Sequence, residues 1–152
     1  RSLKTLHFGL SATGQDFFAG LPQMLESLQI ELKRFERPDA KQLTSSCPNL
    51  LLFKLRIRDL ARTKQSPENW WHLLPKRLHT LHLHFKPRPD SSSAVYTAEH
   101  IASLPKSLTD LVLISRKGDF DAVDNTAALP HLCSLSFHGR CPAWFISALV
   151  RP

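Results

Sequence analysis

The sequence predicts an α/β fold of the solenoid kind, with one parallel β-sheet on the concave face and short helices on the convex face. Two observations predict it. A leucine-rich motif recurs along the whole chain of 152 residues, and the segments between its copies have the composition of short helices. Internal repeats of this length are typical of solenoids, because each copy buries its apolar edge only by stacking on its neighbours.

The recurring motif is L-P-x-(x)-L-x-x-L-x-L. The leucine that opens L-x-x-L-x-L recurs at intervals of 22 to 30 residues, at Leu3, Leu25, Leu50, Leu78, Leu108 and Leu132. The apolar residues of L-x-L are two apart, so they point to the same face of a strand. A proline before the strand ends the preceding helix and needs no ladder hydrogen bond. Each copy therefore predicts a strand; the copies at Cys47-Pro48 and Leu129-Pro130 are one residue shorter.

The segments between the strands predict short helices at residues 15–19, 39–43, 67–73, 97–102, 121–123 and 142–146. Thr97 is suited to an N-cap, and Pro142 to a first helical position. The Trp70-Trp71 pair predicts one ring in the core and one partly exposed ring on an outer helix. The Pro- and Ser-rich stretch 86–93 predicts a surface loop.

These copies resemble the repeats of the leucine-rich-repeat superfamily. Their L-P-x-x-L-x-x-L-x-L form is similar to repeats in fungal and protist cytosolic proteins, some of which carry an F-box, and to the repeats of bacterial effector ubiquitin ligases. The resemblance implies a right-handed solenoid, and a role as a substrate receptor or scaffold that binds another protein. We expect residues 1–152 to form a single domain of about six repeats. Because both ends fall within a motif copy, we also expect a fragment of a longer solenoid.

The positive charge is concentrated in the middle of the chain. The formal net charge is +7, and residues 50–89 hold nine cations against two anions, which accounts for all of it. Such a distribution favours an acidic partner and has no bearing on the fold.

The x positions around L-x-L point out of the core and form three rows across the stacked strands. The first row is Thr5, Ser27, Leu52, Thr80, Asp110 and Ser134; the second is His7, Gln29, Lys54, His82, Val112 and Ser136; the third is Gly9, Glu31, Arg56, His84, Ile114 and His138. The centre of this face is predicted to be basic and rich in histidine. The predicted partner-binding residues are Gln29, Lys54, Arg56, Arg58, His82, His84 and Lys86.

The favoured function is recognition of a protein with an acidic surface. The alternative is binding of nucleic acid or another polyanion, with Lys54, Arg56, Arg58 and Lys86 contacting phosphates. The rows lack interleaved aromatic residues for base stacking, which argues against a reader of single strands.

Catalytic and metal sites are not predicted. The H-x-H pair of His82 and His84 has no third ligand within reach, and no P-loop, G-x-S-x-G or H-E-x-x-H motif occurs, so neither an enzyme nor a cofactor or small-molecule substrate is expected. No apolar run is long enough to span a membrane, so no membrane association is expected.

The three cysteines, Cys47, Cys133 and Cys141, form no disulfide framework, which favours an intracellular protein, cytoplasmic or nuclear. Cys47 replaces the leucine of Leu-Pro and is predicted to be buried.

Overall fold

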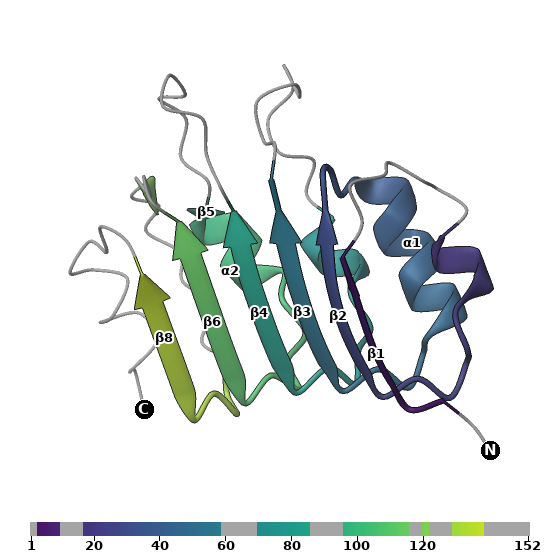
Figure 1. Ribbon diagram of the computed structural model, residues 1–152. Helices are drawn as coiled ribbons and strands as arrows, with labels where there is room; N and C mark the ends of the chain where they lie inside the picture. The colour runs from purple at the N-terminus through teal and green to yellow at the C-terminus, as the bar shows by residue number, and fades with distance from the viewer. Residues whose placement is uncertain are drawn as a thin grey trace.

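The computed structural model describes residues 3–9, 17–58, 70–85, 96–115, 120–121 and 129–138. Within these residues six parallel strands form one sheet, and helices lie against one of its faces (Figure 1). The strands are β1 (Thr5–Gly9), β2 (Ser27–Leu32), β3 (Leu52–Ile57), β4 (Thr80–Phe85), β6 (Asp110–Ser115) and β8 (Ser134–His138). Their order in the sheet is their order in the chain. The predicted α/β class and parallel sheet are therefore confirmed.

The strands pair in the register that the motif predicts. Leu28 lies opposite Phe53, which lies opposite Leu81, so equivalent motif positions face one another across the sheet. Lys54 lies between Gln29 and His82 in the same way, on the opposite face. This register matters because a shift of one residue would exchange the buried and exposed faces of a strand.

Four short helical segments form the layer behind the sheet. They are η1 (Phe18–Gly20), α1 (Arg37–Ser46), η2 (Trp71–Leu73) and α2 (Ala98–Ala102). The first turn of α1 contains Pro38, and the Asp39 carboxylate accepts a hydrogen bond of 2.8 Å from the backbone N–H of Glu36. α1 contacts both η1 and η2, and the hydroxyl of Thr44 donates to the carbonyl of Leu73.

Two of the predicted helices are not found in the described structure. The helix predicted at 121–123 is wrong at its first residue, because Asp121 lies in β7 (Phe120–Asp121), a strand parallel to β5 (Tyr96–Thr97). Helix propensity is a weak preference, and here backbone pairing with β5 overrides it. The helix predicted at 142–146 and the loop predicted at 86–93 lie outside the described residues.

Tight turns lead into the strands. In the longer motif copies the carbonyl of the proline accepts a hydrogen bond from the residue three positions later, as Pro75 does from Leu78 at 3.2 Å. In the shorter copies the residue before the proline accepts it, as Cys47 does from Leu50 at 3.2 Å. Proline therefore moves from the first to the second position of the turn, where its fixed φ is favoured. Either arrangement delivers the leucine to the same buried place, so the missing residue is absorbed in the turn.

Just before each of five strands, one backbone carbonyl accepts two hydrogen bonds from the start of the neighbouring strand that follows in the sheet. The backbone N–H groups of Leu51 and Leu52 both donate to the carbonyl of Glu26, at 2.8 and 3.0 Å. The carbonyls of Lys4, Leu51, His79 and Thr109 accept pairs of N–H groups in the same way. These shared acceptors tie each turn to its neighbour and set the register of the strand that follows.

The core lies between the sheet and the helical layer. The inward motif positions of β2, β3, β4 and β6 are at most 2% exposed, as Leu81 and Leu113 are. The motif leucines in the turns before these strands, such as Leu25 and Leu50, are equally buried. A chain of ring contacts runs behind the sheet from Phe8 to His100, through Phe17, Phe18, Phe35, Trp70 and Trp71. Trp70 and Trp71 stack with their centroids 5.3 Å apart and are both buried, so the prediction of one partly exposed tryptophan is wrong. Each ring is covered because Trp70 also packs on Phe35 and Trp71 on His100.

The cost of removing an inward leucine is predicted to depend on whether its strand is flanked on both sides. Leu81→Ala in β4 should lower the free energy of unfolding by about 2–5 kcal/mol, because the cavity lies between two packed strands. Leu6→Ala, at the same motif position in β1, should cost about 1 kcal/mol, because Leu6 is only partly buried in an edge strand of the described sheet. Urea denaturation followed by circular dichroism would measure both, and equal losses would contradict this view of the core.

Candidate functional site

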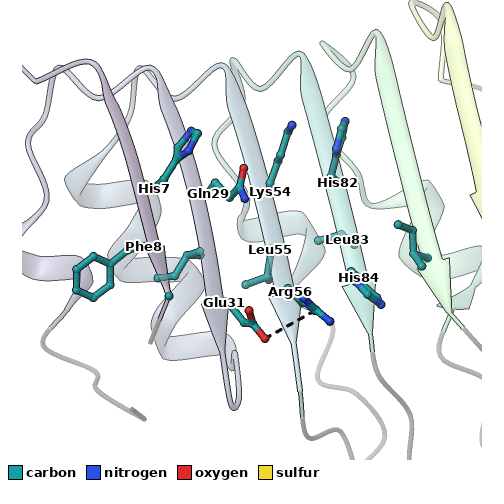
Figure 2. Close-up of a pocket in the computed structure, with 13 residues that line it drawn as sticks. His7, Phe8, Gln29, Glu31, Lys54, Leu55, Arg56, His82, Leu83 and His84 are labelled. Carbon is teal, nitrogen blue, oxygen red and sulfur yellow. Dashed lines mark ion pairs between the residues drawn. The ribbon is translucent and has the colours of Figure 1, made fainter. Parts of the chain in front are cut away.

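The face of the sheet opposite the helices, which we call the open face, carries the three predicted rows of side chains. Its centre is a hollow of about 430 Å³ that extends from β1 to β6 (Figure 2). The side chains around it come from the second and third rows, and they include His7, Gln29, Glu31, Lys54, Arg56, His82, His84 and Ile114. The floor is formed by the strands themselves, so the rigid sheet positions every group that a ligand would meet.

Lys54 occupies the middle of the second row. It is half-buried, with Gln29 on one side and His82 on the other. Among the described residues no carboxylate forms an ion pair with Lys54. Its charge is therefore available to an anionic group entering the hollow.

Burial lowers the pKa of His82, and the positive charge of Lys54 lowers it further. The Asp110 carboxylate acts in the opposite direction. The imidazole is therefore biased towards the neutral form, which can both donate and accept a hydrogen bond. An anion bound beside Lys54 would reverse this bias and favour protonation of His82.

The third row contains an acidic residue among the cations. The Oε1 atom of Glu31 lies 3.7 Å from the Nε atom of Arg56 and also accepts a hydrogen bond from Arg58 (Figure 2 shows the Glu31–Arg56 pair). The hydrogen bond from Arg58 is the main cause of a lowered pKa for Glu31, and the charges of Arg56, Arg58 and His84 add to it. Glu31 is thus ionised and held against the two guanidinium groups.

The predicted basic, histidine-rich centre contains acidic groups as well as cations. The described part of the open face carries four cations, Lys33, Lys54, Arg56 and Arg58, against two carboxylates, Glu31 and Asp110. The register in the sheet places Glu31 directly beside Arg56 although the two are 25 positions apart in the sequence. The open face therefore has mixed charge, and Lys54, the unpaired cation of the second row, lies at its centre.

The predicted partner-binding residues fall into three groups. Gln29, Lys54, Arg56, His82 and His84 line the hollow together. Arg58 follows β3 and does not line the hollow, although it contacts Glu31, which does. Lys86 lies outside the described residues.

A second charged surface was missed in the sequence. Lys76, Arg77 and Lys106 are exposed in the turns that precede β4 and β6. Beside them is a hollow of about 750 Å³, lined by His79, Lys106, Ser107, Thr109, Pro130, His131, Leu132 and Cys133. The signal was present in the phrases Leu-Pro-Lys-Arg and Leu-Pro-Lys-Ser, because the motif places the residues after each proline in the turn before a strand and not on the open face.

The cysteines differ in environment. Cys47 is fully buried, as predicted, and burial raises the pKa of its thiol to about 11. Cys133 is exposed, and its Sγ atom lies 3.4 Å from the backbone carbonyl of His131. Cys141 lies outside the described residues. A buried, protonated thiol is a small hydrophobic side chain and a poor nucleophile.

The electrostatic contact between Lys54, His82 and Asp110 can be tested directly. Lys54→Met should raise the pKa of His82, and Asp110→Asn should lower it, because the first change removes a cation and the second an anion. NMR titration of the His82 ring protons would measure both shifts. A pKa of His82 that is the same in the two variants would show that these charges are not neighbours.

Within the described ranges, no helix is both long enough and apolar enough to cross a membrane. The same ranges contain no group of three or more His, Cys, Asp or Glu side chains arranged to hold a metal ion. Comparison of the chain with protein-family models, with curated proteins and with solved structures finds no match.

Proposed function

We propose that the chain is a leucine-rich-repeat solenoid that binds a protein partner on its open face, which is the concave face of the solenoid. Three features support the solenoid. The motif recurs six times in the sequence, the strands follow one another in the sheet in chain order, and the described helices lie on one face only. The other face is left to exposed side chains, which is where solenoids bind their ligands.

The observation that carries the proposal is the hollow around Lys54. It lies over five neighbouring strands and offers an unpaired ammonium group, the amide of Gln29 and the ring of His82. A carboxylate would be bound by Lys54 and oriented by hydrogen bonds from its neighbours. We therefore propose that the partner presents an extended acidic segment that crosses the strands through this hollow.

The mixed charge of the open face supports a protein partner over nucleic acid there. Glu31 and Asp110 lie on either side of Lys54, two rows apart. A phosphate backbone would bring negative charges against both carboxylates, whereas a protein segment can place an anion at Lys54 and other groups beside the acids. For the same reasons we propose a binding module and not an enzyme, acting as a receptor or scaffold and without a cofactor.

Reversal of the central charges should weaken the binding of acidic peptides. We expect Lys54→Glu/Arg56→Glu to reduce affinity at least about tenfold, because truncating or reversing a desolvated charge at an interface costs about 2 kcal/mol or more. Peptides selected on the wild-type chain from a displayed library would be measured by isothermal titration calorimetry. Circular dichroism would establish that the variant is folded.

The matched control is Arg37→Glu/Lys41→Glu, which changes the net charge equally at two exposed cations of α1 that do not line the hollow. It should bind the selected peptides as the wild type does. The proposal fails if both variants lose affinity equally, since the effect would then follow net charge. It also fails if the selected peptides show no enrichment of Asp and Glu.

Neutralising Glu31 should strengthen peptide binding. Glu31→Gln removes the internal carboxylate that engages Arg56 and Arg58, and those guanidinium groups become available to the ligand. We expect a gain of about twofold to fivefold, since an exposed ion pair is worth at most about 1 kcal/mol. Glu26→Gln is the control, because Glu26 pairs with Lys4 at 2.8 Å in the turns before the strands. The same calorimetric assay would compare the two, and a larger gain for the Glu26 variant would contradict the role of Glu31.

A further inference from the structure

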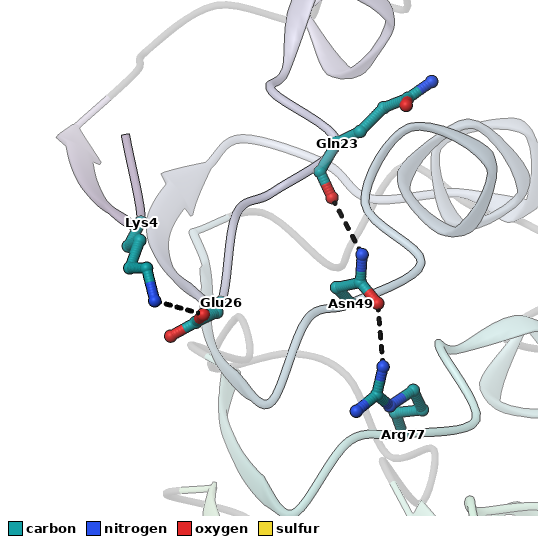
Figure 3. Close-up of polar contacts among 5 residues, drawn as sticks. All are labelled: Lys4, Gln23, Glu26, Asn49 and Arg77. Atoms are coloured by element: carbon teal, nitrogen blue, oxygen red, sulfur yellow. Dashed lines mark hydrogen bonds and ion pairs between the residues drawn. The ribbon is translucent and has the colours of Figure 1, made fainter. Parts of the chain in front are cut away.

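The strands all begin at one edge of the sheet, which we call the turn edge, formed by residues 3–4, 22–26, 48–51, 75–79, 105–109 and 130–133. Polar contacts connect its turns. The side-chain amide of Asn49 donates to the carbonyl of Gln23 at 3.4 Å, and Arg77 donates to the side-chain carbonyl of Asn49 at 2.8 Å (Figure 3). Further along, the hydroxyl of Ser107 lies 2.7 Å from the carbonyls of Lys76 and Leu78. These contacts hold neighbouring turns side by side.

The charge of this edge is divided into two parts. At the β1 end, Lys4 is neutralised by Glu26 (Figure 3). In the turns before β4 and β6, three exposed cations occur together, Lys76, Arg77 and Lys106. Among the described residues none of the three pairs with a carboxylate, and the partners of Arg77 and Lys106 are the neutral oxygens of Asn49 and Ala102.

The neighbouring hollow continues this positive surface. Lys106, His79 and His131 line it, and no carboxylate does among the residues described. Lys76 and Lys106 occupy the same motif position in adjacent turns, so they are separated by roughly one strand spacing of about 4.8 Å. The turn edge therefore carries three uncompensated cations, whereas the described part of the open face carries four cations and two carboxylates.

We propose that the turn edge binds the phosphate backbone of a nucleic acid, at a site separate from the protein-binding open face. Regularly spaced cations without intervening acids match a regular polyanion, because each Lys or Arg can neutralise one phosphate and release a counterion. The long, exposed side chains adjust to the backbone. The binding is expected to depend little on base sequence, since the residues that line the hollow include no Phe, Tyr or Trp ring for base stacking.

The composition of the edge favours nucleic acid over a membrane surface. Stable attachment to a membrane requires apolar side chains inserted beside the cations. The hollow beside Lys106 is lined mainly by polar residues and Pro130, with Leu132 and Cys133 as its other members. The exposed Leu3 and Met24 belong to turns three and two motif copies away from Arg77. Attraction between charges is thus the main force, and it should fall steeply with salt.

Fluorescence anisotropy with a labelled DNA duplex would test the proposal, with the salt concentration raised from about 50 to about 200 mM. For the wild-type chain, a plot of the logarithm of the binding constant against the logarithm of the salt concentration should have a slope of about −3, as expected for three phosphate contacts. Lys76→Glu/Arg77→Glu should lose at least about tenfold in affinity at the lowest salt concentration. Lys54→Glu/Arg56→Glu is the matched control, since it makes the same change in net charge on the open face and should remain within about threefold of the wild type.

The proposal is overturned if the wild type does not bind the duplex at the lowest salt concentration, or if the two double variants lose affinity equally. It is also overturned if vesicles of phosphatidylcholine and phosphatidylserine bind the chain more tightly than the duplex does, which would identify a membrane surface as the partner. Acidic peptides provide a separate readout, because Lys76→Glu/Arg77→Glu should leave their affinity unchanged. The two binding proposals can therefore fail independently.

Discussion

The alternation of inward and outward side chains along in-register parallel strands is the constraint on which the rest of the structure depends. Every inward position of β3 meets an equivalent position of β2 and of β4, so the core is continuous across the sheet. The same pairing aligns the outward positions into rows, and that alignment creates the hollow around Lys54. The shared carbonyls before the strands, such as that of Glu26, fix this register at the point where each strand starts. The core therefore uses the inward residues of these strands, and the proposed recognition uses the outward residues that alternate with them.

The strands and their register could be predicted because the leucines repeat in the sequence. The two apolar residues of L-x-L are local information, and they identify both the strand and its buried face. The extent of the helices was less predictable, since α1 spans Arg37–Ser46 while the sequence suggested 39–43. Its start depends on the contact between Glu36 and Asp39, and its position behind the sheet on contacts with η1 and η2. The burial of Trp70 likewise depends on Phe35, which is distant in the sequence.

The rows of the candidate site were predictable, but their electrostatic character was not. Counting charges along residues 50–89 omitted Glu31, which reaches Arg56 only through the pairing of β2 with β3. The same count assigned Lys76 and Arg77 to the segment that forms the centre of the open face, although they lie in a turn at the edge of the sheet. The sign and position of a patch are properties of neighbouring strands and turns, so a sum along the chain merges surfaces that point in different directions. The open face is mixed in sign, whereas the described turns before β4 and β6 carry cations and no carboxylate.

The strand order has a consequence for how the protein is made. Each strand of the large sheet after β1 pairs with the preceding strand of that sheet, so the described strands lie in the sheet in the order in which they occur in the chain. During translation, each emerging strand would find its partner already synthesised and its register set by the carbonyl before that partner. Chain segments that are close in synthesis are then close in structure, which keeps loop-closure entropy low at every step. Such a sheet can assemble in the direction of synthesis, one strand at a time, without waiting for the C-terminal part of the chain.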